Sequence, residues 1–127
     1  MSISKIDVNT EPTYWHADAV VAGDYIFTSY QAGVYDDDGH LIDTVDGQTE
    51  QAIKNLAGTL AKAGATLEDV VKVDLYFADK SDRPLANVHW LRLWPHQAHR
   101  PARQAHQSAL PEGCCLQIVA MAVLEGG

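Results

Sequence analysis

Arg103 has the most readily interpreted chemistry in this sequence. It ends the segment Pro101-Ala102-Arg103. A guanidinium stays charged at neutral pH, and its planar fork matches the two oxygens of a carboxylate. Arg103 is therefore suited to holding a small carboxylic acid. A surface arginine or a structural ion pair is the alternative interpretation.

Three other side chains can hold water or move protons. His16 has an imidazole, which titrates near neutrality, although a packing or surface role is the alternative. The phenol of Tyr30 can donate to a nitrogen or a carbonyl, and packing is as reasonable a role for it. Gln117 shares a predicted strand face with Val119 and Met121. Its amide can bind a water but cannot take a proton, and if buried it needs partners from the backbone or from a ligand.

Little in the sequence supports a bound metal or organic cofactor. Three histidines occur near the prolines at 95 and 101, namely His96, His99 and His106. These prolines predict a loop with no acidic or cysteine ligand at useful spacing. The run Asp36-Asp37-Asp38-Gly39 is typical of a solvated turn and lacks the spacing of a calcium loop. No glycine-rich phosphate loop occurs, so we expect neither a metal nor a cofactor.

The two cysteines, Cys114 and Cys115, are adjacent. Neighbours in a strand point to opposite faces, so they do not easily form a disulfide with each other. Their apolar surroundings are expected to raise the thiol pKa and to make them poor nucleophiles. Residues 1–9 have neither a basic flank nor an apolar run, so no signal peptide is expected. These features favour a reducing cytoplasm.

The chain of 127 residues predicts a single domain over 1–127. Nine basic and 17 acidic residues give a net charge of −8, which disfavours nucleic acid as a partner. We also expect no membrane partner, because no basic amphipathic stretch occurs and no apolar run approaches the roughly 18 residues that span a bilayer. Three Trp, five Tyr and two Phe are many for so small a domain and favour oligomerisation.

Hydrophobic patterns predict six strands and two helices. The strands are expected at residues 3–8, 19–22, 25–29, 70–77, 103–108 and 114–124. One helix is indicated by an apolar stripe of Thr49, Ala52, Ile53, Leu56 and Leu60, with Gly64 as its stop. The other starts near Ser81-Asp82 and Pro84 and ends at Pro95. The order β-β-β-α-β-α-β-β predicts an α+β fold with both helices on one face of a single sheet.

The strand at 70–77 is expected to be half buried. Its predicted core face consists of Val71, Val73, Leu75 and Phe77. Val70 is expected on the other face.

Short segments over nearly the whole chain resemble the Rid family, also called the YjgF family. The matching segments are Gly23 to Gln31, Gln48 to Leu56, Ala63-Gly64 with Asp69 to Val73, the trio Asn87, Trp90 and Trp94, Pro101-Ala102-Arg103, and Ala120 to Val123. Each is weak alone, but six in order are specific. The resemblance implies a chorismate-mutase-like fold and a homotrimer with a cleft between each pair of subunits.

The resemblance also implies an activity and a set of site residues. Family members hydrolyse 2-imino acids to 2-keto acids and ammonia without a cofactor, and Arg103 matches the arginine that grips the substrate carboxylate. Ser29 and Gln31 belong to one matching segment, and Trp90 to another. The turn that contains Glu112 and Cys114 resembles the family's substrate-contacting loop.

Four positions depart from the pattern of the well-studied deaminases. Gln117 stands where they have a glutamate that positions water, and Ala105 replaces a cysteine. Tyr30 replaces a glycine, and His16 falls at a tyrosine position. One residue is also missing between Arg103 and Leu110.

These departures leave more than one function open. A deaminase of a bulkier or non-standard imine or enamine acid is one hypothesis. A non-catalytic trimer that binds a small anionic carboxylate is the alternative, with Gln117 and Ala105 in its favour. A ribonuclease, the third possibility, is disfavoured by the net charge of −8.

Overall fold

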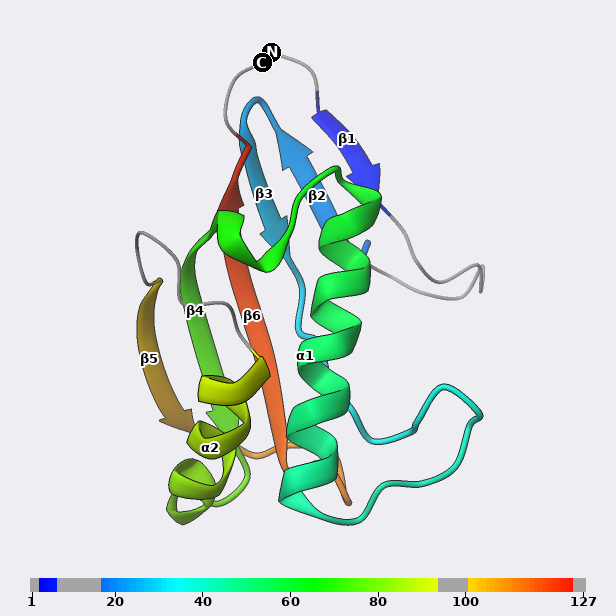
Figure 1. The fold of residues 1–127 in the computed structure, drawn as a ribbon, viewed down its shortest axis with the longest axis vertical. Helices are drawn as coiled ribbons and strands as arrows, with labels where there is room; N and C mark the ends of the chain where they lie inside the picture. The colour runs from blue at the N-terminus through cyan, green and yellow to red at the C-terminus, as the bar shows by residue number, and fades with distance from the viewer. Residues whose placement is uncertain (1–2, 7–16, 94–100, 125–127) are drawn as a thin grey trace.

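The chain forms one six-stranded sheet with two helices on the same face (Figure 1). The computed structural model describes residues 3–6, 17–93 and 101–124. The strands are β1 (Ile3–Ile6), β2 (Ala19–Ala22), β3 (Tyr25–Thr28), β4 (Val70–Phe77), β5 (Ala102–Gln107) and β6 (Leu116–Val123). The helices are α1 (Val45–Lys62) and α2 (Arg83–Leu93), with short 3-10 turns at Leu67–Asp69 and Lys80–Asp82. The predicted order and fold class are confirmed.

The strands lie in the order β1-β2-β3-β6-β4-β5. The β4–β5 pair is parallel and the other neighbours are antiparallel. Parallel pairing requires a crossover between the two strands, and α2 lies in it. The strand β5 therefore forms one edge of the sheet.

Helix α1 follows the predicted stripe closely. The Thr44 hydroxyl caps it by accepting a hydrogen bond from the Gly47 amide at 3.0 Å. The five stripe residues are all buried. The helix ends at Lys62, and Gly64 has a φ of +83°, a conformation that suits glycine after a helix end.

The core lies between the helices and one face of the sheet. Its fully buried side chains include Ile26, Leu56, Phe77 and Ile118. The outer face of the sheet is different, because Tyr25 is 51% exposed and Phe27 44% exposed there. The described helices both lie on the inner face, so these rings remain open to solvent in a single chain (Figure 1).

One local prediction was wrong. The pairing of β4 with β6 shifts register between Val70 and Lys72, which buries Val70 and leaves Val71 half-buried, the reverse of the prediction. An irregularity of this kind adds a residue and reverses the alternation that a sequence pattern assumes. The start of α2 agrees with the prediction, because the helix begins at Arg83, between Asp82 and Pro84. A 3-10 turn precedes it, in which Asp79 accepts a hydrogen bond from the Ser81 amide.

Candidate active site

Arg103 lies on the inner face of the edge strand β5. It is in register with Val73, which is fully buried on that face. The Arg103 Cζ atom lies 5.4 Å from the ring centroid of Trp90 in α2, a cation–π distance. Burial, together with the charge of Arg83, lowers the pKa of the Arg103 guanidinium. The group still carries its charge at neutral pH, as a carboxylate ligand requires.

Gln117 lies on the opposite face. Its neighbours Leu116 and Ile118 are buried on the inner face, so alternation directs Gln117 outward. It pairs with Tyr76 of β4, which is likewise directed outward. A single chain therefore does not bring Arg103 and Gln117 together.

A cleft of about 600 Å³ contains four of the predicted site residues. Its lining consists of Tyr30, Ala32, Val34, Tyr35, Asn55, Pro111, Glu112, Cys114 and Gln117. Tyr30 is half-exposed, at 48%. Neither Arg103 nor Trp90 lines this cleft. The structure thus groups Tyr30, Glu112, Cys114 and Gln117, and places Arg103 with Trp90 elsewhere.

The turn that carries Glu112 is held by a buried glutamine that the sequence analysis did not single out. The Nε2 atom of Gln48 donates to the carbonyls of Ile42 at 2.8 Å and Gly113 at 2.7 Å. Its Oε1 atom accepts from the Cys115 amide at 2.8 Å. Gln48 is fully buried, four residues before Ala52 on the apolar stripe of α1. A polar residue in line with the apolar stripe is the sequence signal that could have identified Gln48 as a buried, hydrogen-bonded side chain.

Ser29 and Gln31 lie outside this cleft. The Ser29 hydroxyl donates to the Asp18 carbonyl at 3.2 Å. The backbone of Gln31 pairs with Ile118, and its side-chain oxygen accepts from the Thr59 hydroxyl at 3.2 Å. Both contacts hold the segment after β3 against the core. A role for these two residues in binding stays a prediction.

Both cysteines are free thiols. The Sγ atom of Cys114 lies 3.4 Å from the Leu116 carbonyl and donates to it. Burial raises the pKa of the Cys114 thiol, and burial with the nearby charge of Asp82 raises the pKa of Cys115. The prediction of unreactive thiols is therefore supported at neutral pH.

A family model described as Endoribonuclease L-PSP matches residues 8–124. The chain belongs to this family, the Rid family. It is 34% identical over 110 residues to the 2-iminobutanoate/2-iminopropanoate deaminase of Rattus norvegicus, covering 85% of this chain and 79% of that protein. It is 32% identical over 111 residues to Reactive Intermediate Deaminase A, chloroplastic, of Arabidopsis thaliana. That match covers 86% of this chain but only 58% of the plant protein.

Solved structures confirm the Rid fold. RidA from the Antarctic bacterium Psychrobacter sp. PAMC 21119 superposes with a TM-score of 0.79 at 28% identity, covering 90% of this chain and 92% of that one. The Rid protein YyfA of Yersinia pestis gives a TM-score of 0.85 at 24% identity, covering 97% of this chain and all of that one. The second match supports the fold alone.

His16 lies outside the described residues, so its role as a proton carrier stays a prediction. Within the described part of the chain, no helix is long and apolar enough to cross a membrane.

The outer face of this Rid domain also carries an aspartate–histidine pair that sequence reasoning missed. His106 Nε2 lies 3.0 Å from Asp74 Oδ1, and the imidazole stacks on Tyr76 with ring centroids 4.8 Å apart. Tyr76 is in register with both His106 and Gln117, so these three residues form a row across β5, β4 and β6. From the sequence, His106 was considered only as a metal ligand. Its pairing with Asp74 could not be predicted, because no local pattern indicates that β5 pairs with β4.

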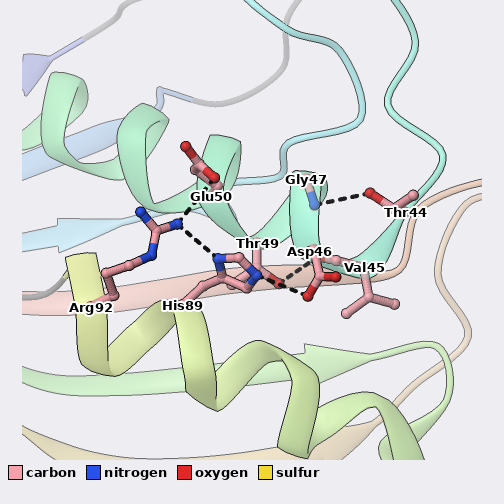
Figure 2. Close-up of polar contacts among 8 residues, drawn as sticks. All are labelled: Thr44, Val45, Asp46, Gly47, Thr49, Glu50, His89 and Arg92. Carbon is pink, nitrogen blue, oxygen red and sulfur yellow. Dashed lines mark hydrogen bonds and ion pairs between the residues drawn. The ribbon is translucent and has the colours of Figure 1, made fainter.

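A polar network fixes the position of α2 on α1 (Figure 2). His89 lies between Asp46, whose Oδ1 is 2.8 Å from Nε2, and Arg92, whose NH2 is 3.1 Å from Nδ1. Arg92 also donates to Glu50 at 3.3 Å. Because this network uses one side of α2, the other side of the helix is turned toward Arg103.

Proposed function

We propose that this Rid protein hydrolyses a 2-imino or enamine carboxylic acid to a 2-keto acid and ammonia. The observation that carries the proposal is Arg103, supported on the Trp90 ring and engaged in no ion pair within the described residues. Its relatives named as deaminases make the reaction class reasonable. A cytoplasmic location stays a prediction.

Arg103 would hold the substrate carboxylate through two parallel hydrogen bonds. This contact fixes the adjacent imine carbon relative to the protein, and such orientation can supply much of a modest rate enhancement. The Trp90 ring below the guanidinium restricts its movement. The side chain of the acid would extend along α2.

The chemical step requires water and two proton transfers. Water attacks the imine carbon, and the C=N double bond becomes a single bond in a carbinolamine. The C–N bond then breaks, and both protons of the water leave on nitrogen as ammonia. The Gln117 amide can orient the attacking water but cannot accept its proton.

The proton must therefore pass to another group or directly to the imine nitrogen. His16 and Tyr30 are the candidates that the sequence provides. The Asp74–His106 pair is a third, because a carboxylate that orients an imidazole is a common arrangement for general bases. Its position in one row with Gln117 favours it.

We propose that the site is completed in a homotrimer, because its two halves lie on opposite faces of the sheet. The edge strand β5 carries Arg103, and the outer face carries Gln117 near one end of β6 and the exposed rings of Tyr25 and Phe27 toward its other end. A cyclic assembly can place the edge of one subunit against the outer face of the next. Such contact would bury the exposed rings and join the two halves.

A non-catalytic carboxylate-binding protein is the second candidate function. The amide at Gln117 favours it, since no proton acceptor replaces the glutamate at that strand position. A ribonuclease activity, which the name of the family model suggests, is opposed by the net charge of −8.

The test is to generate 2-imino acids in situ with an amino-acid oxidase and to follow their hydrolysis. Semicarbazide traps the imine, so a deaminase reduces the yield of the trapped product. We expect the protein to reduce trapping for at least one acid among small, acidic and aromatic side chains. If trapping equals that in buffer for all of them, the deaminase proposal is wrong and the binding protein is favoured.

A further inference from the structure

Arg83 starts helix α2 on the side that faces Arg103. Arg83, Asn87 and Trp90 follow one another at intervals of four and three residues, which places them on one face of the helix. Trp90 on this face lies under the Arg103 guanidinium at 5.4 Å. The two arginines therefore border one stretch of surface between α2 and β5.

Neither arginine is neutralised by an acidic side chain within the described residues. Among the described residues, the arginine that forms an ion pair is Arg92. Its partner is Glu50 of α1, so this pair lies on the side of α2 that faces α1 (Figure 2). The charge of Arg83 is close enough to lower the pKa of Arg103, in addition to the effect of burial. Two unpaired cations in a chain with nine basic and 17 acidic residues are an arrangement that an anion would stabilise.

Asn87 provides an independent observation on the same helix face. Its Oδ1 atom is buried and has no hydrogen-bond partner among the described residues. Buried carbonyl oxygens without a donor are uncommon in folded proteins. A rotation of the Asn87 side chain would bring this oxygen within reach of an N–H group of a ligand held beside Arg103.

We propose that Arg83 and Arg103 form a two-cation site and that the substrate is a 2-imino dicarboxylic acid. Arg103 takes the carboxylate next to the imine, the Asn87 oxygen accepts the imine N–H, and Arg83 takes the distal carboxylate. Seven helical residues separate Arg83 from Trp90, a rise of about 10 Å. Trp90 supports Arg103, so this rise approximates the separation of the two arginines along α2. Their side chains, with a short dicarboxylate between them, can span it. This inference rests on the proposed function and specifies its substrate class.

The first test measures binding and needs no turnover. Isothermal calorimetry compares 2-oxoglutarate, a dianion, with 2-oxobutanoate, a monoanion. We expect the wild-type protein to bind the dianion about tenfold more tightly, the contribution of one charge-assisted pair. Arg83→Gln should remove this preference and weaken the binding of 2-oxobutanoate by a much smaller factor.

Arg92→Gln is the matched control, because it removes the same charge from the same helix on the side that faces α1. It should retain the preference for the dianion. Equal affinities of the wild-type protein for the two acids, or an unchanged preference in Arg83→Gln, would overturn the two-cation site.

The second test measures hydrolysis of the imines made from glutamate and from 2-aminobutanoate. We expect the ratio of kcat/KM to favour the glutamate imine and to fall about tenfold in Arg83→Gln. If the protein hydrolyses the monocarboxylate imine and Arg83→Gln leaves the ratio unchanged, the inference is wrong while the proposed function stands. If it hydrolyses no imine but shows the binding preference, the proposed function and the assignment of an imine substrate are wrong, and the two-cation site stands as a dicarboxylate-binding site.

Discussion

Arg103 and Gln117 project from opposite faces of the same sheet. Arg103 is in register with Val73, which is buried on the inner face. Gln117 is in register with Tyr76, which is directed to the outer face. The residue that can hold a carboxylate and the residue that can orient water are thus separated by the sheet. We therefore expect a working site to take these two side chains from different subunits.

Replacing Arg103 tests the geometry of carboxylate binding as well as its charge. Arg103→Lys keeps a positive charge but loses the planar fork that binds both oxygens. We expect kcat/KM for an accepted imine to fall about 10- to 100-fold, equivalent to about 1.5–3 kcal/mol. Steady-state kinetics measures this effect. A lysine variant with full activity would show that Arg103 does not bind the substrate in a bidentate manner.

A carboxylate at position 117 should increase turnover, because it can take the proton that an amide cannot. We predict a higher kcat at neutral pH in Gln117→Glu, together with a loss below about pH 4.3, where a carboxyl group becomes protonated. Leu41→Glu is the control, since it adds the same charge at a position that is 64% exposed and outside the cleft that contains Gln117. An equal increase in the control would assign the effect to charge alone. No increase in Gln117→Glu would remove residue 117 from the proton pathway.

Gln48 should contribute strongly to stability through its three hydrogen bonds. Gln48→Leu has nearly the same volume but leaves the buried Ile42 and Gly113 carbonyls and the Cys115 amide without this partner. We expect the free energy of unfolding to fall by about 2–4 kcal/mol. Denaturant titration measures the loss. Lys62→Leu, an exposed position on the same helix, should change it by less than about 0.5 kcal/mol.

The two thiols should make stability fall at alkaline pH. Burial raises the pKa of Cys114 and of Cys115 in the folded protein, whereas the unfolded thiols ionise near their usual pKa of about 8.5. The unfolded state then binds fewer protons above that pH, so the free energy of unfolding decreases as pH rises.

The measurement is the free energy of unfolding between pH 7 and pH 10. We expect a shallower decline in a variant that combines Cys114→Ala and Cys115→Ala than in the wild-type protein. Below about pH 7.5 the two proteins should show parallel pH dependence, since the thiols stay protonated in both states. Parallel curves up to pH 10 would contradict the raised pKa values.

Local patterns were sufficient to predict the elements of this fold. The apolar stripe through Leu56 and Leu60 and the stop at Gly64 depend on a helical period and a glycine conformation, and both are encoded within a few residues. The side of the sheet on which Val70 lies could not be predicted from such a local pattern. It depends on a shift in the pairing of β4 with β6, which lie about 50 residues apart in sequence.

The candidate site was predictable in composition but not in arrangement. Family-like motifs identified Arg103 and Gln117, yet their separation by the sheet follows from two strand registers that no local pattern contains. The pairing of His106 with Asp74 has the same origin, because a parallel register brings β5 beside β4. Long-range pairing therefore determines which of the predicted residues can act together.

Subunit complementation tests the shared site most directly. Arg103→Ala removes the carboxylate contact, and Gln117→Trp fills the cleft that residue 117 lines, so each variant alone should be inactive. The two are unfolded, mixed and refolded together, and native mass spectrometry of differently tagged chains verifies that mixed trimers form. If each site takes Arg103 from one subunit and Gln117 from the next, random mixing restores about a quarter of the sites. Verified mixed trimers without recovered imine hydrolysis would show that no site is shared in this way.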